Sequence, residues 1–334
     1  MYHKETSWLM NSTASALNNN LCSYKESNDK VHFAVVHKGT VNIVTVTSSI
    51  GSSVSDSVKD SNPSARTISC NEASGSGATV TILQAKWVTL RSQTLLVIST
   101  LRGIQVFEMD GTVLLFWHRL ETDDAEYSEE MFARGIAACG QNLLCVGTHD
   151  GSVLIFSMPA ESNTLNYVDK VRYHPAAISD LCGQGQTLIS GDDHGNLVVW
   201  EGSTTLKKVK ELESFQSPAT SIACWEELVM VGYGSGHIRL FNITTGIRRA
   251  EITAHASWIT AVDIALESGL AISVSEDSFV RVWQLKKDGS PVVSYKSSCN
   301  ITNIQLCGGC FVNNLGSAFC TTGYDLNEIL YFHV

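Results

Sequence analysis

Cysteine and histidine are the residues of this chain best suited to bind metal or act as nucleophiles, and it contains ten of each. Cys307 and Cys310 form a C-x-x-C pair, but structural zinc requires four ligands and the chain offers no second pair. Spacing in phase with a repeat predicts small buried side chains, so we expect no metal site and no cofactor. Four cysteines recur at intervals of 43, 42 and 83 residues, the last close to two periods: Cys139, Cys182, Cys224 and Cys307.

The local motifs of common enzymes are missing. The histidines are dispersed, and the sequence holds no H-E-x-x-H zinc motif, no G-x-S-x-G nucleophile elbow and no G-x-x-x-x-G-K phosphate loop. We therefore predict a protein that is not an enzyme and has no catalytic residues. A catalytic set assembled in space from distant segments stays an open alternative.

One pattern recurs along the chain: a short β-rich run, a tight turn, and an alternating apolar run that ends in an aromatic residue. Copies lie at 98–107, 146–156, 189–200, 231–241, 273–283 and 321–332. A blade of a β-propeller has four short strands and a repeat of about 40–45 residues. Because one such blade cannot bury both of its faces alone, the repeats must stack. The closing aromatic residues are spaced by 49, 44, 41, 42 and 49 residues: Phe107, Phe156, Trp200, Phe241, Trp283 and Phe332.

A seventh hairpin lies upstream at 32–46, with Gly39 at its turn. Seven hairpins predict an all-β fold, a single seven-bladed β-propeller domain that spans 1–334. The chain stops at Val334, directly after the third strand of the last unit, which leaves one edge open. We expect the segment around Thr6–Met10 to supply the missing strand and close the ring in the last blade. An open sandwich of many strands, or two β domains, is the alternative.

At these hairpins the sequence resembles the WD-repeat family of β-propellers. That family places a His before the first strand, an Asp in the hairpin turn and a Trp on the third strand. The sixth unit matches with His255, Asp277 and Trp283, and it has Ser273 or Ser275 on the second strand. Such a set can form hydrogen bonds inside the blade, which a buried Asp requires.

The other units match the family less well. The fourth has His174 and Trp200, but His194 stands where the turn Asp is expected. We therefore expect the polar set to be complete in the sixth blade only. The resemblance implies a WD-repeat scaffold and brings no catalytic residues. Four longer segments resemble one subgroup of the family more closely: 132–140, 232–241, 275–283 and 321–329.

Large side chains near the hairpin turns are candidates for contacting a partner protein. Trp258 follows His255 by three residues and precedes the apolar strand expected at 259–265. A Trp exposed at the mouth of a ring is a typical interface anchor, because its burial contributes much affinity at little entropic cost. Tyr233 and His149, in turns of other blades, are expected on the same face. The alternative is a half-packed, structural Trp258.

Two segments do not match the blade pattern. Residues 47–77 contain 11 serines and no aromatic residue, which predicts a flexible insertion because so little apolar area can be buried. Phosphorylation there is only weakly indicated. Residues 121–130 contain six acidic residues and no basic one, which predicts a solvated loop between blades. A docking site for a basic partner is the alternative for this acidic segment.

Composition narrows the class of partner. Charged residues make up 17% of the chain and the formal net charge is −10, so we expect no general attraction to nucleic acid or anionic bilayers. The sequence has no run of 18 apolar residues and no apolar N-terminal signal, which predicts no membrane span and a cytoplasmic location.

We therefore expect a non-enzymatic WD-repeat scaffold that mediates protein–protein interactions with one or more partners of unknown identity. The first alternative is an enzyme with its site in the central channel. The second is a lipid-binding propeller, because residues 247–250 (IRRA) partly resemble a phosphoinositide-binding motif. Composition and motifs leave open whether the protein is a monomer or a homo-oligomer.

Overall fold

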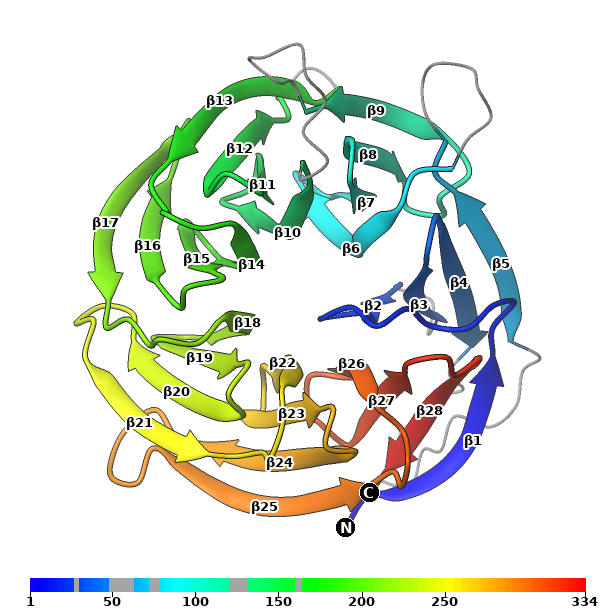
Figure 1. Cartoon of the computed structure of the whole chain (residues 1–334), viewed down its shortest axis with the longest axis vertical. Helices are drawn as coiled ribbons and strands as arrows, with labels where there is room; N and C mark the ends of the chain where they lie inside the picture. The colour runs from blue at the N-terminus through cyan, green and yellow to red at the C-terminus, as the bar shows by residue number, and fades with distance from the viewer. Residues whose placement is uncertain (27–29, 48–62, 72–78, 121–130, 160–163) are drawn as a thin grey trace.

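Seven four-stranded antiparallel sheets surround a central axis in the computed structural model (Figure 1). The structure describes residues 1–26, 30–47, 63–71, 79–120, 131–159 and 164–334. All regular secondary structure within those ranges is β-strand. None of the described residues forms a helix able to cross a membrane. The predicted seven-bladed β-propeller is therefore confirmed.

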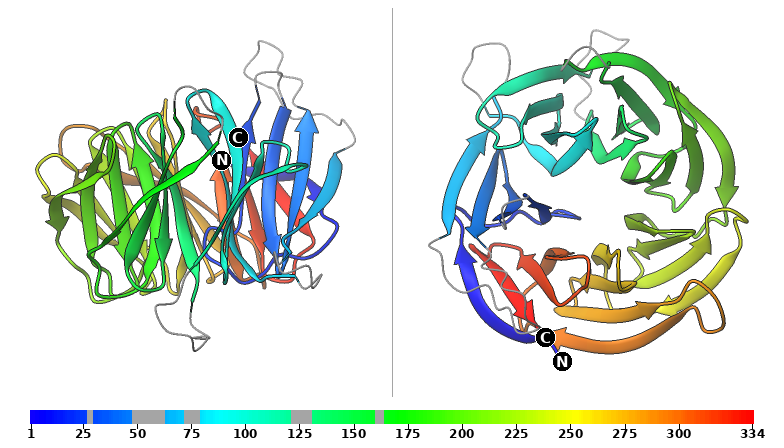
Figure 2. Two further views of the ribbon diagram at one scale, coloured as in Figure 1. Left: turned by 90° about the horizontal axis from the view of Figure 1, so that it is seen from above. Right: turned by 180° about the vertical axis from the view of Figure 1, so that it is seen from behind.

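Each blade runs from an inner strand beside the axis to an outer strand at the rim, and the side view shows the blades standing side by side (Figure 2). The first three blades are β2 (Cys22–Lys25), β3 (Lys30–His37), β4 (Thr40–Thr47), β5 (Ser64–Ser69); β6 (Ile82–Leu90), β7 (Gln93–Thr100), β8 (Gly103–Glu108), β9 (Leu114–Arg119); and β10 (Ala133–Cys139), β11 (Leu143–Thr148), β12 (Ser152–Ser157), β13 (Asn166–Arg172).

The fourth and fifth blades follow in the same order. They are β14 (Ile178–Gln184), β15 (Thr187–Asp192), β16 (Leu197–Gly202), β17 (Leu206–Leu212); and β18 (Ala219–Trp225), β19 (Leu228–Tyr233), β20 (His237–Asn242), β21 (Arg248–Thr253). The sixth and seventh are β22 (Ile259–Ala265), β23 (Leu270–Ser275), β24 (Phe279–Leu285), β25 (Val293–Asn300); and β26 (Leu306–Phe311), β27 (Ala318–Gly323), β28 (Glu328–His333), β1 (His3–Leu9).

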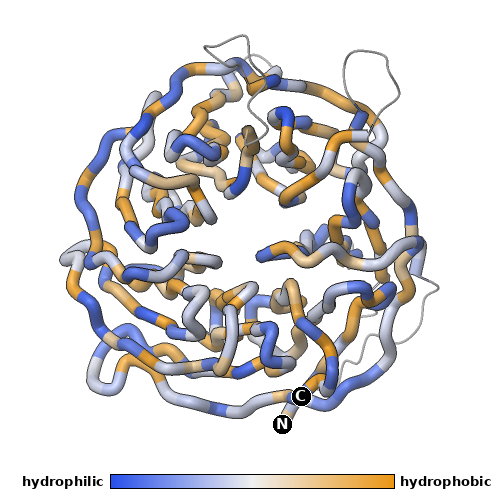
Figure 3. The backbone as a smooth tube through the Cα atoms, in the orientation of Figure 1, coloured by the Kyte–Doolittle hydropathy of each residue, from blue (hydrophilic) through white to orange (hydrophobic). Residues whose placement is uncertain are grey.

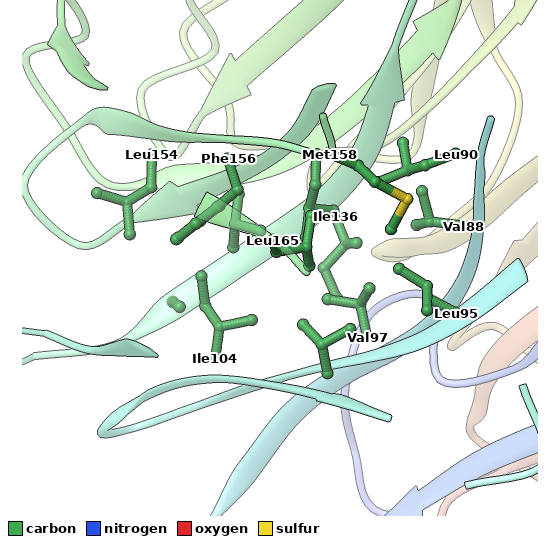
Figure 4. Close-up of a cluster of buried hydrophobic side chains, with 14 of the residues drawn as sticks. Val88, Leu90, Leu95, Val97, Ile104, Ile136, Leu154, Phe156, Met158 and Leu165 are labelled. Carbon is green, nitrogen blue, oxygen red and sulfur yellow. The ribbon is translucent and has the colours of Figure 1, made fainter. Parts of the chain in front are cut away.

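The apolar core is divided among the blade boundaries. Alternating strand residues place apolar side chains on both faces of each sheet, so each boundary is filled from two sides. Between the second and third blades, Val97 and Ile104 face Ile136 and Phe156 in one buried cluster (Figure 4). Hydrophobic residues are correspondingly spread around the whole ring (Figure 3). No blade is therefore a stable unit without its neighbours.

The closing aromatic residues all lie on the third strand of their blade and are nearly inaccessible to solvent. In five blades the register between the third and fourth strands shifts directly before this residue, as between Val282 and Trp283. Such an irregularity bends and twists the strand. The aromatic side chain thereby lies where the outer strand begins to curve around the rim.

The N-terminal strand closes the ring. β1 pairs antiparallel with β28, with Trp8 opposite Ile329. The indole of Trp8 lies 5.2 Å from the rings of both Phe33 in the first blade and Tyr331 in the seventh. The two chain ends therefore lie together in one blade (Figure 1), and closure by the N-terminal segment is confirmed.

The Ser-rich stretch is not wholly outside the blades. Residues 64–69 form β5, which pairs with β4 along its length and completes the first blade. Only Ile68 of this strand is buried, so the segment lacks the apolar alternation by which strands are recognised in sequence. The expected insertion at 47–77 is corrected in this respect. Residues 48–62 and 72–78 lie outside the described part of the chain.

Trp8 and Leu9 provide a direct test of closure. Trp8 is 6% exposed and Leu9 is 62% exposed, although they are neighbours on the same strand. We expect Trp8→Ala to lower the free energy of unfolding by about 3–5 kcal/mol, because it leaves a cavity between the seventh and first blades. Leu9→Ala should change it by less than about 0.5 kcal/mol. Denaturant unfolding compares the two, and equal effects would show that β1 does not hold the ring.

Candidate functional site

The polar residues proposed for the sixth blade lie together at the start of its first strand. His255 Nδ1 is 3.0 Å from Asp277 Oδ2, and His255 Nε2 is 2.7 Å from Ser273 Oγ. Trp283 Nε1 donates to the same Ser273 oxygen over 2.9 Å. Because an ionised carboxylate can only accept, His255 donates its Nδ1 hydrogen to Asp277. The Ser273 hydroxyl bridges His255 Nε2 and the indole of Trp283.

Asp277 is the anionic end of this chain of hydrogen bonds. Burial raises the pKa of its carboxyl group, but hydrogen bonds from His255 and from the backbone N–H groups of Ala256 and Phe279 more than offset burial and lower it to about 2. The carboxylate thus ties the segment before β22 to the β23–β24 turn. These partners give the set a structural role inside the blade.

The fourth blade holds a second complete set, contrary to the expectation of only one. His174 Nδ1 is 3.1 Å from Asp192 Oδ2, His174 Nε2 is 2.6 Å from Ser190 Oγ, and Trp200 Nε1 donates to Ser190 over 2.8 Å. Asp192 lies two residues after its serine, whereas Asp277 lies four residues after Ser273. His194 occupies the turn position and contributes only its backbone N–H to Asp192. The two aspartates therefore stand at different positions relative to their serines, but each pairs with the Nδ1 atom of its histidine.

The fifth blade replaces the polar set with aromatic packing. Tyr233 stands at the strand position of Asp192 and Ser275, and its ring lies 4.8 Å from Phe215, which precedes the first strand. Tyr233 is completely buried, and Arg239 lies over Phe215 at 3.9 Å. Tyr233 therefore packs inside the blade and cannot contact a partner. The expectation that it lies exposed in a turn is corrected, because it ends β19 with its side chain turned inward.

Trp258 is partly buried by a segment that the sequence did not reveal. Its indole packs over Gly234, where a Cβ atom would lie 2.6 Å from the ring, and its Nε1 donates to Asn18 Oδ1 over 3.0 Å. Asn18 belongs to residues 10–21, which we call the N-terminal strap. This indole is therefore engaged within the protein, as in the half-packed alternative.

The N-terminal strap runs from the rim to the axis (Figure 1) before the chain enters β2. Asn19 N donates to Thr260 O in the sixth blade over 2.8 Å, and Ser221 Oγ in the fifth blade donates to Asn19 Oδ1 over 2.6 Å. Asn20 N donates to Cys307 O in the seventh blade. Ser15 N donates to Val36 O in the first blade, and the chain returns to that blade at β2, so the strap reaches over one mouth of the channel.

His149 lies on the same face as Trp258, three blade positions away in the β11–β12 turn. Its backbone N–H donates to Phe132 O, and its ring lies 6.0 Å from the Phe132 ring. His149 is partly buried, and its Nδ1 has no hydrogen-bond partner among the described residues. The structure does not bring His149, Trp258 and Tyr233 together as one site.

The channel wall is held together by side chains that bond to the neighbouring blade. In six blades the register between inner and second strands shifts near the start of the inner strand, which turns polar side chains sideways. At each of the seven blade boundaries an inner-strand side chain forms a hydrogen bond with the backbone of the adjacent blade. The pairs are Cys22–Ala85, Gln84–Gly135, Arg134–Ile178, Asp180–Ile222, Ser221–Val262, Asp263–Phe311 and Ser23–Phe311.

A cavity of about 580 Å³ occupies the channel between these strands. Asn19 of the strap lines it at one mouth, and the hairpin residues Leu266 and Leu315 line it at the opposite mouth. Both leucines are more than half exposed. The cavity therefore communicates with solvent on the face that bears the hairpins between first and second strands.

The buried carboxylates of the cavity link neighbouring blades, which is a structural role. Burial raises the pKa of Asp263 to about 6, partly offset by hydrogen bonds from the N–H groups of Phe311 and Ile264. Burial likewise raises the pKa of Asp180, whose Oδ2 accepts from Ile222 N over 2.8 Å. In the described residues, no three His, Cys, Asp or Glu side chains lie close enough together to hold a metal ion.

Exposed apolar side chains gather on the rim of the second and third blades. Leu114, Leu115 and Trp117 of β9 are 37–49% exposed, and Tyr167 and Val168 of β13 are 42–48% exposed. The two strands meet where the rings of His118 and Tyr167 stack at 5.1 Å. We call these five exposed residues the outer apolar belt. Sequence reasoning missed it, although VLLFWHRL at 113–120 showed unusual apolar content for an outer strand.

Comparison with known proteins agrees with this architecture. The family model described as WDR54 matches residues 1–334. The chain belongs to the WDR54 family. WD repeat-containing protein 54 of Mus musculus is 36% identical and that of Homo sapiens is 32% identical, each over 99% of both chains. The closer resemblance indicated by four sequence segments is thereby confirmed.

The fold of this WDR54 family member is also similar to solved WD-repeat propellers. A chain in the crystal structure of a mitotic checkpoint complex superposes with a TM-score of 0.72, covering 99% of this chain and 91% of that one. Its sequence identity is 14%, so the similarity concerns the fold alone.

The two polar sets can be compared by mutation. We expect Asp192→Ala and Asp277→Ala each to lower the free energy of unfolding by about 1–3 kcal/mol, because each leaves a buried histidine without its acceptor. Ser235→Ala, in the matching exposed turn of the fifth blade, should change it by less than about 0.5 kcal/mol. Denaturant unfolding measures all three. A small effect of Asp192→Ala alone would show that the fourth blade does not use its set.

Trp258 tests the anchoring of the strap. Trp258→Phe keeps a ring over Gly234 but removes the donor to Asn18, so the amide hydrogens of Asn19 and Asn20 should exchange at least about fivefold faster by local opening. Trp225→Phe is the matched control, because it removes a Trp N–H bond to Leu266 O elsewhere in the ring. Hydrogen-exchange mass spectrometry reports both. Unchanged exchange in the strap would show that Trp258 does not hold it.

Proposed function

We propose that this protein is a non-enzymatic platform that binds partner proteins through the outer apolar belt. The observation that carries the proposal is the exposure of five large apolar side chains on two adjoining outer strands. Exposed apolar surface marks interaction sites, and Trp and Tyr are frequent anchors of such interfaces. The rigid ring supports the proposal because it holds both strands in place without a partner.

The belt contrasts with the outer strand of the fourth blade. Charged residues dominate the exposed surface of β17, where only Val209 is a large exposed apolar residue. A partner for the belt should therefore present apolar side chains of its own. The acidic segment at 121–130 follows β9 in sequence but lies outside the described residues, so docking of a basic partner there remains a prediction.

The enzyme alternative has less support from the channel. The carboxylates of Asp180 and Asp263 and the hydroxyl of Ser221 all bond to backbone N–H groups of neighbouring blades. A catalytic site instead requires a nucleophile and a base aligned with each other, and oriented donors for the developing charge. The described channel wall shows no such alignment.

The lipid-binding alternative is also weakly supported. Arg248 of the IRRA segment lies 2.8 Å from Glu251 and 3.1 Å from Glu213, so its charge is already paired. Arg249 Nη2 donates to Gly289 O at 3.5 Å. Anionic headgroups would have to compete with these acids, which disfavours recognition of phosphate here.

Paired variants test the belt. Leu114→Thr with Trp117→Thr removes two anchors while keeping residues that suit a strand. In proximity labelling, we expect the signal of the main wild-type partners to fall at least about tenfold for this double variant. Its melting point should stay within a few degrees of the wild-type value. Val209→Thr with Ile247→Thr is the control, since both residues are exposed apolar rim positions outside the belt. Binding of the identified partner is then measured with purified proteins.

Two results would contradict the proposal. A folded belt variant that keeps the wild-type partner set would place binding on another surface. Loss of the same partners by the control variant would show that general rim hydrophobicity, not the belt, causes the capture.

A further inference from the structure

The channel wall contains two cysteines whose positions are set by a hydrogen bond between blades. Asp180 Oδ2 accepts from Ile222 N over 2.8 Å and fixes the alignment of the inner strands β14 and β18. These strands run in the same direction around the ring. Cys182 and Cys224 each follow that contact by two residues, so both side chains return to the same side of their strands. The two side chains therefore lie at the boundary of the fourth and fifth blades, where they pack in one apolar cluster.

The sulfur atoms also face solvent-accessible space. Cys182 and Cys224 both line the channel cavity, and Cys182 is only partly buried. Both lie toward the C-terminal ends of their strands, nearer to the channel mouth opposite the strap. A small solute can thus reach the pair through the cavity of about 580 Å³.

Neighbouring groups favour a thiolate on Cys182. The neighbouring Cys224 thiol and, more weakly, the positive charge of Lys86 lower the pKa of Cys182, against burial and the nearby Asp180. The neighbouring Cys182 and burial raise the pKa of Cys224. Lys86 and Cys182 lie at the same height along the channel axis. Each follows the first paired residue of its inner strand by four residues.

The other eight cysteines of the chain differ in the pKa of their thiols. Cys22 and Cys310 also line the cavity, but burial raises the pKa of all eight. Cys310 and Cys320 are a useful comparison because they are direct partners across β26 and β27. That pair has proximity, but burial raises the pKa of both thiols and disfavours a thiolate.

We propose that Cys182 and Cys224 form a peroxide-reactive dithiol on the channel wall that closes to a disulfide between the fourth and fifth blades. The Cys182 thiolate attacks one oxygen of a hydroperoxide, the O–O bond breaks, and an alkoxide or hydroxide leaves and takes up a proton. The sulfur is now a sulfenic acid. The Cys224 sulfur attacks it, forming the S–S bond and releasing water. Two thiols are oxidised by two electrons, and the peroxide is reduced to water and an alcohol, or to two waters.

The test uses the full chain, fully reduced and treated with hydrogen peroxide. After alkylation of remaining thiols, peptide mapping without reductant should show a linked pair containing Cys182 and Cys224, formed at least about tenfold faster than any link between Cys310 and Cys320. The measurement is made on the wild type, so it does not depend on the folding of a variant. Absence of the Cys182–Cys224 link, or formation no faster than the control pair, overturns the proposal.

Single substitutions assign the order of the steps. Cys224→Ser should accumulate sulfenic acid at Cys182, detected by dimedone labelling, because no thiol remains to resolve it. Cys182→Ser should give no sulfenic acid at Cys224. Equal labelling of both variants would overturn the assignment of Cys182 as the attacking thiol, and thermal unfolding of each variant confirms that the ring is intact.

Discussion

The pairing of β1 with β28 is the interaction on which the rest of the structure depends. Every blade buries apolar side chains on both faces, so one missing strand would expose an edge and loosen two neighbouring boundaries. Closure also determines the path of the N-terminal strap. On its way from the outer strand of the seventh blade to the inner strand of the first, the chain reaches over a channel mouth, where Asn19 binds Thr260 and Ser221.

Features encoded by local alternation could be predicted from the sequence. Hairpins, closing aromatic residues such as Phe156 and Trp283, and the number of blades follow from apolar periodicity and turn residues, which do not depend on distant contacts. β5 was missed because its exposed position leaves only Ile68 to mark it. An outer strand of this kind is held by backbone pairing, which has no side-chain signature.

The candidate site was less predictable because its residues are defined by three-dimensional neighbours. The same strand position holds Ser275, Asp192 and Tyr233 in three blades. Asp192 at this position bonds to a histidine before the first strand, Tyr233 packs on Phe215, and in the sixth blade Asp277, two residues after Ser275, bonds to the histidine instead. The contact of Trp258 with Asn18 joins residues 240 positions apart, and no local pattern reports it.

The distribution of polar atoms separates the inside of the ring from its outside. Near the axis, carboxylates and hydroxyls are engaged in bonds between blades, because an open channel would otherwise leave backbone groups at each bulge unpaired. This requirement restricts the inner strands and leaves little freedom for a binding site built from polar side chains. The outer strands do not have to form these bonds between blades. Their exposed residues can therefore differ, as β9 exposes Leu114 and Trp117 whereas β17 exposes lysines. Differences in recognition among propellers of this architecture are therefore expected at the rim and in the loops, where substitutions do not disturb the closure of the ring.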